Sequence, residues 1–101
     1  MAKKMKPIHP GEVLCHEFME PLELSQRGLA RALGVPVTRI SKIIAAERGI
    51  TADTALRLGR YFGTSAEMWL NMQSGYDLRR ARYDSEKAIN KQVKPMKQDA
   101  A

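Results

Sequence analysis

The segment SQRGLARALGVPVTRISKII, residues 25–44, decides the fold of this 101-residue chain. Ser25 is a residue type that caps helices, and Gly34 stands where a left-handed residue closes one, so a short helix is expected between them. A second helix should follow, because isoleucines recur there at one-turn spacing. Two helices that cross steeply need a small residue at the crossing, which Ala30 provides, and Ile40 then locks the second helix into the core. The spacing predicts a helix-turn-helix.

Three further helices are expected around this motif, giving an all-α domain of five helices. Pro21, Gly49 and Gly63 mark helix ends, and the fifth helix starts at either Ser65 or a capping box that begins with Thr64. The helices are expected over about residues 10–20, 25–33, 36–46, 51–62 and 65–82, with a core of Val13, Leu14, Phe18, Leu29, Ala30, Leu33, Ile40, Ile43, Ile44, Leu56, Leu58 and Phe62. The domain should occupy residues 8–82, between a flexible basic N-terminus (1–7) and a flexible basic tail (83–101).

Composition excludes several classes of protein. Apolar residues make up 44% of the chain, enough for a core, but none of the apolar runs approaches the roughly 20 residues that cross a bilayer. The N-terminus lacks a secretory hydrophobic segment, so a cytoplasmic location is expected. The single cysteine, Cys15, excludes an intrachain disulfide. The sequence contains no Gly-rich phosphate loop, nucleophile elbow or paired acid–base arrangement, so we expect neither an enzyme nor a cofactor.

Charge is unevenly distributed along the chain. Residues 25–60 hold seven basic and two acidic side chains, whereas residues 12–23 hold four glutamates and no Lys or Arg. A basic segment attracts phosphate, and an acidic one attracts a basic partner. The alternative is that both are ordinary solvated helix faces.

The second helix of a helix-turn-helix enters the major groove with its N-terminal residues toward the base edges. Side chains that avoid the buried isoleucine stripe can hydrogen-bond bases, contact a thymine methyl group or reach the backbone. Polar groups at the start of the first helix and in the following loop can bind phosphate. The candidate DNA-binding residues are therefore Gln26, Val37, Thr38, Arg39, Ser41, Lys42, Arg48 and Thr51, and for each the alternative is exposed helix surface.

Three segments carry a resemblance to a known family: HPGEVL (9–14), EPLELSQRGLARALGV (20–35) and RGITADTALRLGRYFGTSAEMWLNMQSGYDL (48–78). They resemble the HigA antitoxins, also called VapI-like proteins, of the Xre/Cro-like helix-turn-helix family, over about residues 8–81. The resemblance implies a five-helix, lambda-repressor-like DNA-binding fold and a homodimer. It also implies repression of an operon shared with a HigB-type toxin, a ribosome-dependent mRNA-cleaving enzyme that the antitoxin binds and neutralises.

Two positions depart from the family pattern. Position 36 is commonly a capping Ser or Thr, but here Pro36 fits the first helical turn and provides no cap. Position 37 is often Gln, which can read adenine, but here it is Val37. The operator sequence therefore cannot be copied from a relative.

Partner surfaces can be assigned from residue type and spacing. Trp69, Met72 and Tyr76 lie at helical spacing, which fits a dimer interface or the core equally well. Glu12, Glu17 and Glu20 are candidates for binding a basic toxin, against the alternative of a solvated acidic face. His9 and His16 are expected to be structural or solvent-facing, and Cys15 to point away from His16, so no metal site is expected.

Three alternative functions stay open at this stage. A solitary Xre-type repressor without a toxin differs from an antitoxin only in its gene neighbour or a co-purifying partner. A ribonuclease would need an acid–base pair that the sequence does not supply. A protein-interaction module that no longer touches DNA would show no sequence-dependent, salt-sensitive binding.

Overall fold

The computed structural model describes residues 7–97. The predicted flexible N-terminus therefore lies outside the described residues except for Pro7, as does the end of the predicted tail, residues 98–101. The elements are α1 (Pro10–Val13), η1 (Leu14–Met19), α2 (Gln26–Leu33), α3 (Val37–Ile44), α4 (Ala52–Phe62) and α5 (Ala66–Gln92). Residues 7–97 contain no strand, and η1 continues α1, so the predicted all-α fold of five helices is confirmed.

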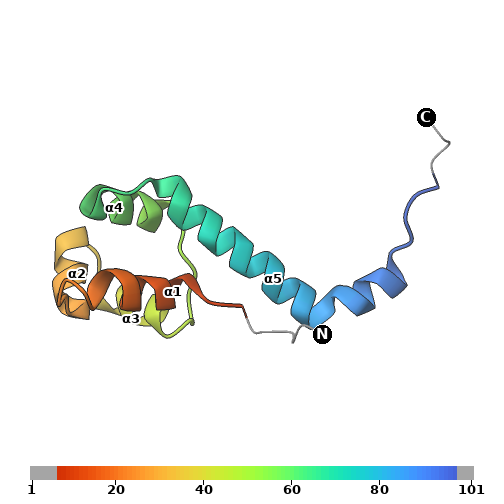
Figure 1. The fold of residues 1–101 in the computed structure, drawn as a ribbon, viewed down its shortest axis with the longest axis horizontal. Coiled ribbons are helices and arrows are strands. Elements are labelled where there is room, and N and C mark those ends of the chain that lie inside the picture. Colours follow the sequence, from red (N-terminus) through yellow and green to blue (C-terminus); the bar gives the residue numbers. More distant parts are fainter. Residues whose placement is uncertain (1–6, 98–101) are drawn as a thin grey trace.

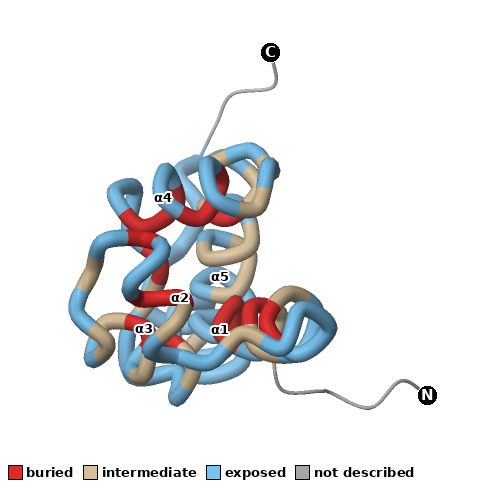
Figure 2. The backbone as a smooth tube through the Cα atoms, turned by 90° about the vertical axis from the view of Figure 1, so that its left-hand side faces the viewer, coloured by how far each residue is buried: buried red, intermediate tan, exposed pale blue. Residues whose placement is uncertain are grey.

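The helices form a compact body from which the last part of α5 projects (Figure 1). Helices α1, α2, α3 and α4 bring their buried residues together, whereas the later turns of α5 are exposed (Figure 2). None of the helices in the described part of the chain combines the length and the apolar character needed to cross a membrane.

The first helix begins with a cap that the sequence did not suggest. The Nδ1 atom of His9 accepts the Gly11 N–H at 2.9 Å, and the Glu12 carboxylate accepts the His9 N–H at 3.3 Å. These two bonds form a capping box, with Pro10 at the first helical position as predicted. The helix then widens into the π-helical segment η1, in which the Glu20 N–H bonds to the Cys15 carbonyl five residues earlier.

The helix-turn-helix forms as the sequence predicts. The Ser25 hydroxyl accepts the Gly28 N–H at 2.9 Å, and Gly34 closes α2 with φ 70°. Only Gly takes this left-handed conformation without a steric cost. Pro36 lies one position earlier than expected: it precedes α3 in extended conformation, where it contributes no side-chain cap.

Two helices end elsewhere than predicted. Helix α3 ends at Ile44, two residues before the expected Ala46. The N–H groups of Ala46, which has φ 62°, and Glu47 bond back to Ile43 and Lys42 in a Schellman pattern, so the helix is closed before Gly49. Helix α5 passes the expected end near Arg82 and continues to Gln92. Charged pairs one turn apart, such as Arg80 with Asp84 at 3.0 Å, support this extension.

Helices α4 and α5 meet through a polar contact at their junction. Gly63 closes α4 as predicted, and Ser65, one of the two predicted alternatives, caps α5 by accepting the Met68 N–H at 3.0 Å. Thr64 instead accepts the indole N–H of Trp69 at 2.8 Å. This bond lets the only tryptophan of the chain lie fully buried in the core.

The hydrophobic core draws on all five helices. Its buried members are Leu14, Met19, Leu29, Ala30, Leu33, Ile40, Ile43, Ile50, Ala55, Leu58 and Trp69, and Phe18 and Phe62 pack against them. Ile44 is only half-buried. The prediction for Leu56 is wrong: it is 65% exposed, because the inward face of α4 is formed by Thr54, Ala55, Leu58 and Gly59.

Candidate nucleic-acid interface

Helix α3 exposes one narrow stripe. Successive residues turn by about 100° around a helix axis, so positions 38, 42 and 45 share a face. Thr38, Lys42 and Ala45 are all exposed, whereas Ile40 and Ile43 on the opposite side are fully buried. The stripe presents a hydroxyl, an ammonium and a methyl group along two turns. These are groups able to contact base edges and phosphates in a groove.

One flank of this stripe is tied to α2. The Ser41 hydroxyl shares its single proton between the Gln26 side-chain oxygen at 2.6 Å and the Val37 carbonyl at 3.1 Å. The structure therefore brings together Gln26 and Ser41, which are fifteen residues apart in the sequence. Val37 is half-buried and packs against the core, so only part of its side chain remains to contact a base. The Gln26 amide lies at the start of α2, where free N–H groups suit a phosphate.

The other flank carries Arg39, which the structure places differently from the exposed candidates. Its side chain is 24% exposed, and one terminal nitrogen donates to the Asp53 carboxylate at 2.8 Å. Its Nε atom is buried without a hydrogen-bond partner. The predicted role of Arg39 in contacting bases therefore competes with an internal ion pair to α4.

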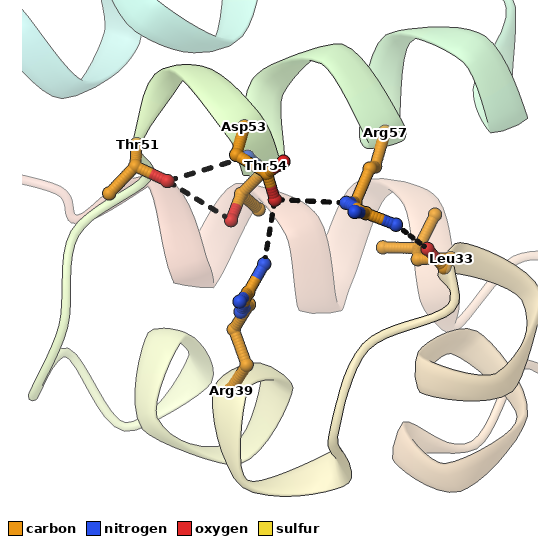
Figure 3. A network of polar contacts seen from close by, with 6 residues as sticks. All are labelled: Leu33, Arg39, Thr51, Asp53, Thr54 and Arg57. Atoms are coloured by element: carbon orange, nitrogen blue, oxygen red, sulfur yellow. Dashed lines mark hydrogen bonds and ion pairs between the residues drawn. The ribbon is translucent and has the colours of Figure 1, made fainter.

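Asp53 is the centre of a polar network that joins three helices (Figure 3). Its Oδ2 atom accepts from Arg39 on α3 and from the Nε atom of Arg57 on α4 at 2.9 Å. Arg57 also donates to the Leu33 carbonyl at the end of α2, again at 2.9 Å. The hydrogen bonds from Arg57 and Arg39 hold the pKa of Asp53 below its usual value, so the carboxylate stays ionised.

The loop between α3 and α4 holds the remaining two candidates. Arg48 is exposed, whereas the Thr51 hydroxyl is the N-cap of α4, accepting the Thr54 N–H at 3.4 Å. The loop is also held to α5, since the Gln73 side chain on that helix accepts the Ile50 N–H at 2.8 Å. Thr51 therefore has a structural role whether or not it contacts DNA.

Sequence reasoning missed two residues that position this face. Asp53 was not among the predicted site residues, although its i, i+4 spacing to Arg57 signals an ion pair. Gly11 gave no signal, yet a Cβ atom there would lie 2.0 Å from the Ile43 carbonyl oxygen on α3. Helix α1 can approach the recognition helix this closely only because residue 11 has no side chain.

The acidic candidates lie on α1 and η1 and at its end. Glu12, Glu17 and Glu20 are all exposed, although Glu12 completes the His9 cap and Glu20 pairs with His16 at 2.9 Å. Burial lowers the pKa of His9, which is consistent with the structural role expected for it. All three glutamates are exposed despite these bonds.

Cys15 does not point away from His16 as expected. The five-residue hydrogen bonds of η1 bring the Cys15 sulfur to 3.8 Å from Glu20, and the ligand atoms of Cys15, His16 and Glu20 lie within 4.8 Å of one another. Burial and the neighbouring Glu20 charge raise the pKa of the thiol. A metal needs the thiolate, which this environment disfavours.

The three candidate dimer residues separate into two groups. Trp69 is fully buried within its own protomer, so its side chain packs in the core and is not available to a partner. Met72 and Tyr76 are half-buried, with the Tyr76 ring 4.8 Å from that of His9. They stay candidates for the interface.

The geometry defines a helix-turn-helix protein whose second helix offers a polar stripe to a groove. Comparison with known proteins agrees: residues 16–69 match the helix-turn-helix family. Virulence-associated protein I of Dichelobacter nodosus is 54% identical over 83 residues, which cover 82% of this chain and 77% of that protein. Antitoxin HigA-1 of Vibrio cholerae is 38% identical over 96 residues, which cover 92% of this chain and 87% of that protein.

A solved structure is similar in the same way. Pseudomonas aeruginosa antitoxin HigA with the higBA promoter has a TM-score of 0.87 and 46% identity, and the match covers 90% of this chain and 99% of that one. The chain therefore belongs to the Xre-like helix-turn-helix family, in the group that contains virulence-associated protein I and the HigA antitoxins. This family consists of regulators rather than enzymes.

Proposed function

We propose that this chain binds operator DNA as a dimer, represses its own operon and neutralises a HigB-type ribonuclease toxin by direct binding. The observation that carries the DNA-binding part is the exposed stripe of Thr38 and Lys42 on α3, flanked by the Ser41–Gln26 pair. A basic chain with net charge +6 adds a general attraction to phosphate. The similarity to Pseudomonas aeruginosa antitoxin HigA, solved with the higBA promoter, supports DNA binding by this chain. Such a protein acts where the DNA is, in the cytoplasm.

Titration of a duplex from the promoter of its own gene tests this proposal. Wild-type protein should bind that duplex more tightly than a scrambled one, with affinity falling steeply as salt rises. Lys42→Ala should weaken binding to the promoter. Lys87→Ala, which removes the same charge from an exposed position on the outer part of α5, is the matched control and should have little effect. Equal affinity for both duplexes would refute operator recognition.

The dimer is proposed to form through α5. Leu78 and Ile89 are 54% and 47% exposed on the part of the helix that leaves the body, and they line a shallow groove of about 200 Å³. Large apolar side chains so exposed on one helix favour an interface with a second copy, which two symmetric half-sites about 34 Å apart also require. Leu78→Asp should shift the sedimentation coefficient to that of a monomer, whereas Lys87→Asp on the same helix should not.

The toxin is proposed to bind the acidic side chains Glu12, Glu17 and Glu20. Complementary charge raises association rates, especially at low salt. Reversal of Glu17 to Lys should slow association with the toxin encoded beside this gene. Reversal of the exposed Glu67 on α5 is the control. An unchanged association rate at low salt for Glu17→Lys would exclude this surface, and the absence of any adjacent toxin gene or co-purifying partner would favour the solitary repressor.

A further inference from the structure

Arg39 lies at the edge of the face that is proposed to bind DNA, yet its charge is directed away from that face. It is about 100° around α3 from Thr38, on the side toward α4. There its guanidinium donates to Asp53 at 2.8 Å, and only 24% of the side chain is exposed. A guanidinium released from this contact would extend from the flank of the recognition helix, where the phosphate backbone borders the groove.

The Asp53 network contributes more to orientation than to stability. Asp53 is 57% exposed and Arg57 is 42% exposed, and ion pairs in such positions add little to the free energy of folding. The network nevertheless connects the ends of three helices, because Arg57 also holds the Leu33 carbonyl (Figure 3). Its main consequence is the position of one cation, Arg39, relative to the recognition stripe.

We propose that Asp53 is a positioning residue that lowers the affinity for DNA by holding Arg39 away from DNA phosphates. This inference rests on the DNA-binding function proposed above. Phosphate contacts carry no sequence information and strengthen binding to every duplex. With Arg39 held by Asp53, discrimination is left to Thr38 and Lys42 on the exposed stripe of α3. Asp53 thus lowers the affinity for every duplex without touching DNA.

Asp53→Asn tests the proposal, because it removes the charge but keeps the shape. The variant should bind the promoter and the scrambled duplex more tightly by similar factors, because an added phosphate contact carries no sequence information. One added phosphate contact steepens the salt dependence by about 0.9, so affinity should fall roughly 3.5-fold more than in wild type between about 50 and 200 mM salt. Glu47→Gln is the matched control. It removes the same charge from an exposed position near α3, and no ion pair among residues 7–97 involves Glu47.

Two further variants separate this role from a structural one. Adding Arg39→Gln to Asp53→Asn should return the salt dependence to the wild-type value, and Arg39→Gln alone should leave it unchanged. A shallower salt dependence for Arg39→Gln alone would show that Arg39 already contacts phosphate, which overturns the proposal. If Asp53→Asn instead weakened binding to both the promoter and the scrambled duplex, with unchanged salt dependence, the proposal would also be overturned. Wild-type protein that shows no promoter preference would instead refute the proposed function itself.

Discussion

Substitution of Gly11 by Ala should damage the domain more than its small size suggests. The added Cβ would lie 2.0 Å from the Ile43 carbonyl oxygen and 3.0 Å from the Ile44 Cα atom, whereas ordinary contact begins at 3.4 Å. Both neighbours are backbone atoms, so no side chain can rotate out of the way, and α1 must move from α3 by more than about 1 Å. Overpacking of this kind costs about 1–3 kcal/mol, and the backbone contact places Gly11→Ala toward about 3 kcal/mol.

Urea unfolding followed by the fluorescence of Trp69 measures this cost, since the chain has one tryptophan and the fold buries it completely. A loss of 2–3 kcal/mol should also lower the melting temperature by roughly 10 °C or more. Gly75→Ala on α5 is the matched control. Its Cβ would meet nothing closer than the end of the Arg79 side chain at 3.4 Å, so it should stabilise the helix by about 0.5–1 kcal/mol. If Gly11→Ala proves as stable as Gly75→Ala, the close contact between α1 and α3 is not as described.

Three other predictions concern stability. Burial lowers the pKa of His9 below 6.5, so the unfolded chain binds the proton more tightly than the folded one, and stability should fall as pH drops below about 6.5. The midpoints of urea unfolding at about pH 7.5 and about pH 5.5 measure this fall. His9→Asn, which keeps a capping residue, should make the fall smaller. Leu58→Ala should lower the free energy of unfolding, measured in urea, by about 2–5 kcal/mol, because Leu58 is fully buried. Leu56→Ala should lower it by under about 0.5 kcal/mol, because Leu56 is exposed. Similar losses for the two variants would contradict this difference in burial. Ala46→Gly should raise the melting temperature, because Gly adopts the left-handed conformation at φ 62° without steric cost and the folded state gains up to about 1 kcal/mol. A lower melting temperature for the variant would show that Ala46 is not strained.

The sequence predicted the features that depend on local chemistry. Ser25, Gly34 and Gly63 act within one or two turns of their own position, and each takes the conformation expected of its residue type. The buried isoleucines of α3 were predicted from spacing alone, because one face of a short helix must pack on something. The exposure of Thr38 and Lys42 follows from the same periodicity.

Features that depend on distant contacts were not predictable in this way. Nothing near Arg39 in the sequence indicates that it forms an ion pair with Asp53, fourteen residues away. The grouping of Cys15 with Glu20 depends on the π-helical register of η1, since an ordinary helix places residues five apart on different sides. The continuation of α5 to Gln92 passes through a polar stretch whose composition is typical of a mobile tail, and pairs such as Arg80–Asp84 become visible only once a helix is assumed.

The recognition helix is held from three directions, and this arrangement explains how its sequence can depart from the family pattern. Helix α1 contacts its end at Gly11, α2 holds it through the Gln26–Ser41 bond, and α4 holds it through Asp53 and Arg39. A capping hydroxyl at position 36 is therefore dispensable, because these tertiary contacts stabilise α3 in place of a hydrogen bond from a cap at its first turn. The exposed stripe takes no part in these three contacts. Its residues can change to suit a different operator while the orientation of α3 stays fixed, so recognition and positioning are carried by separate sets of side chains.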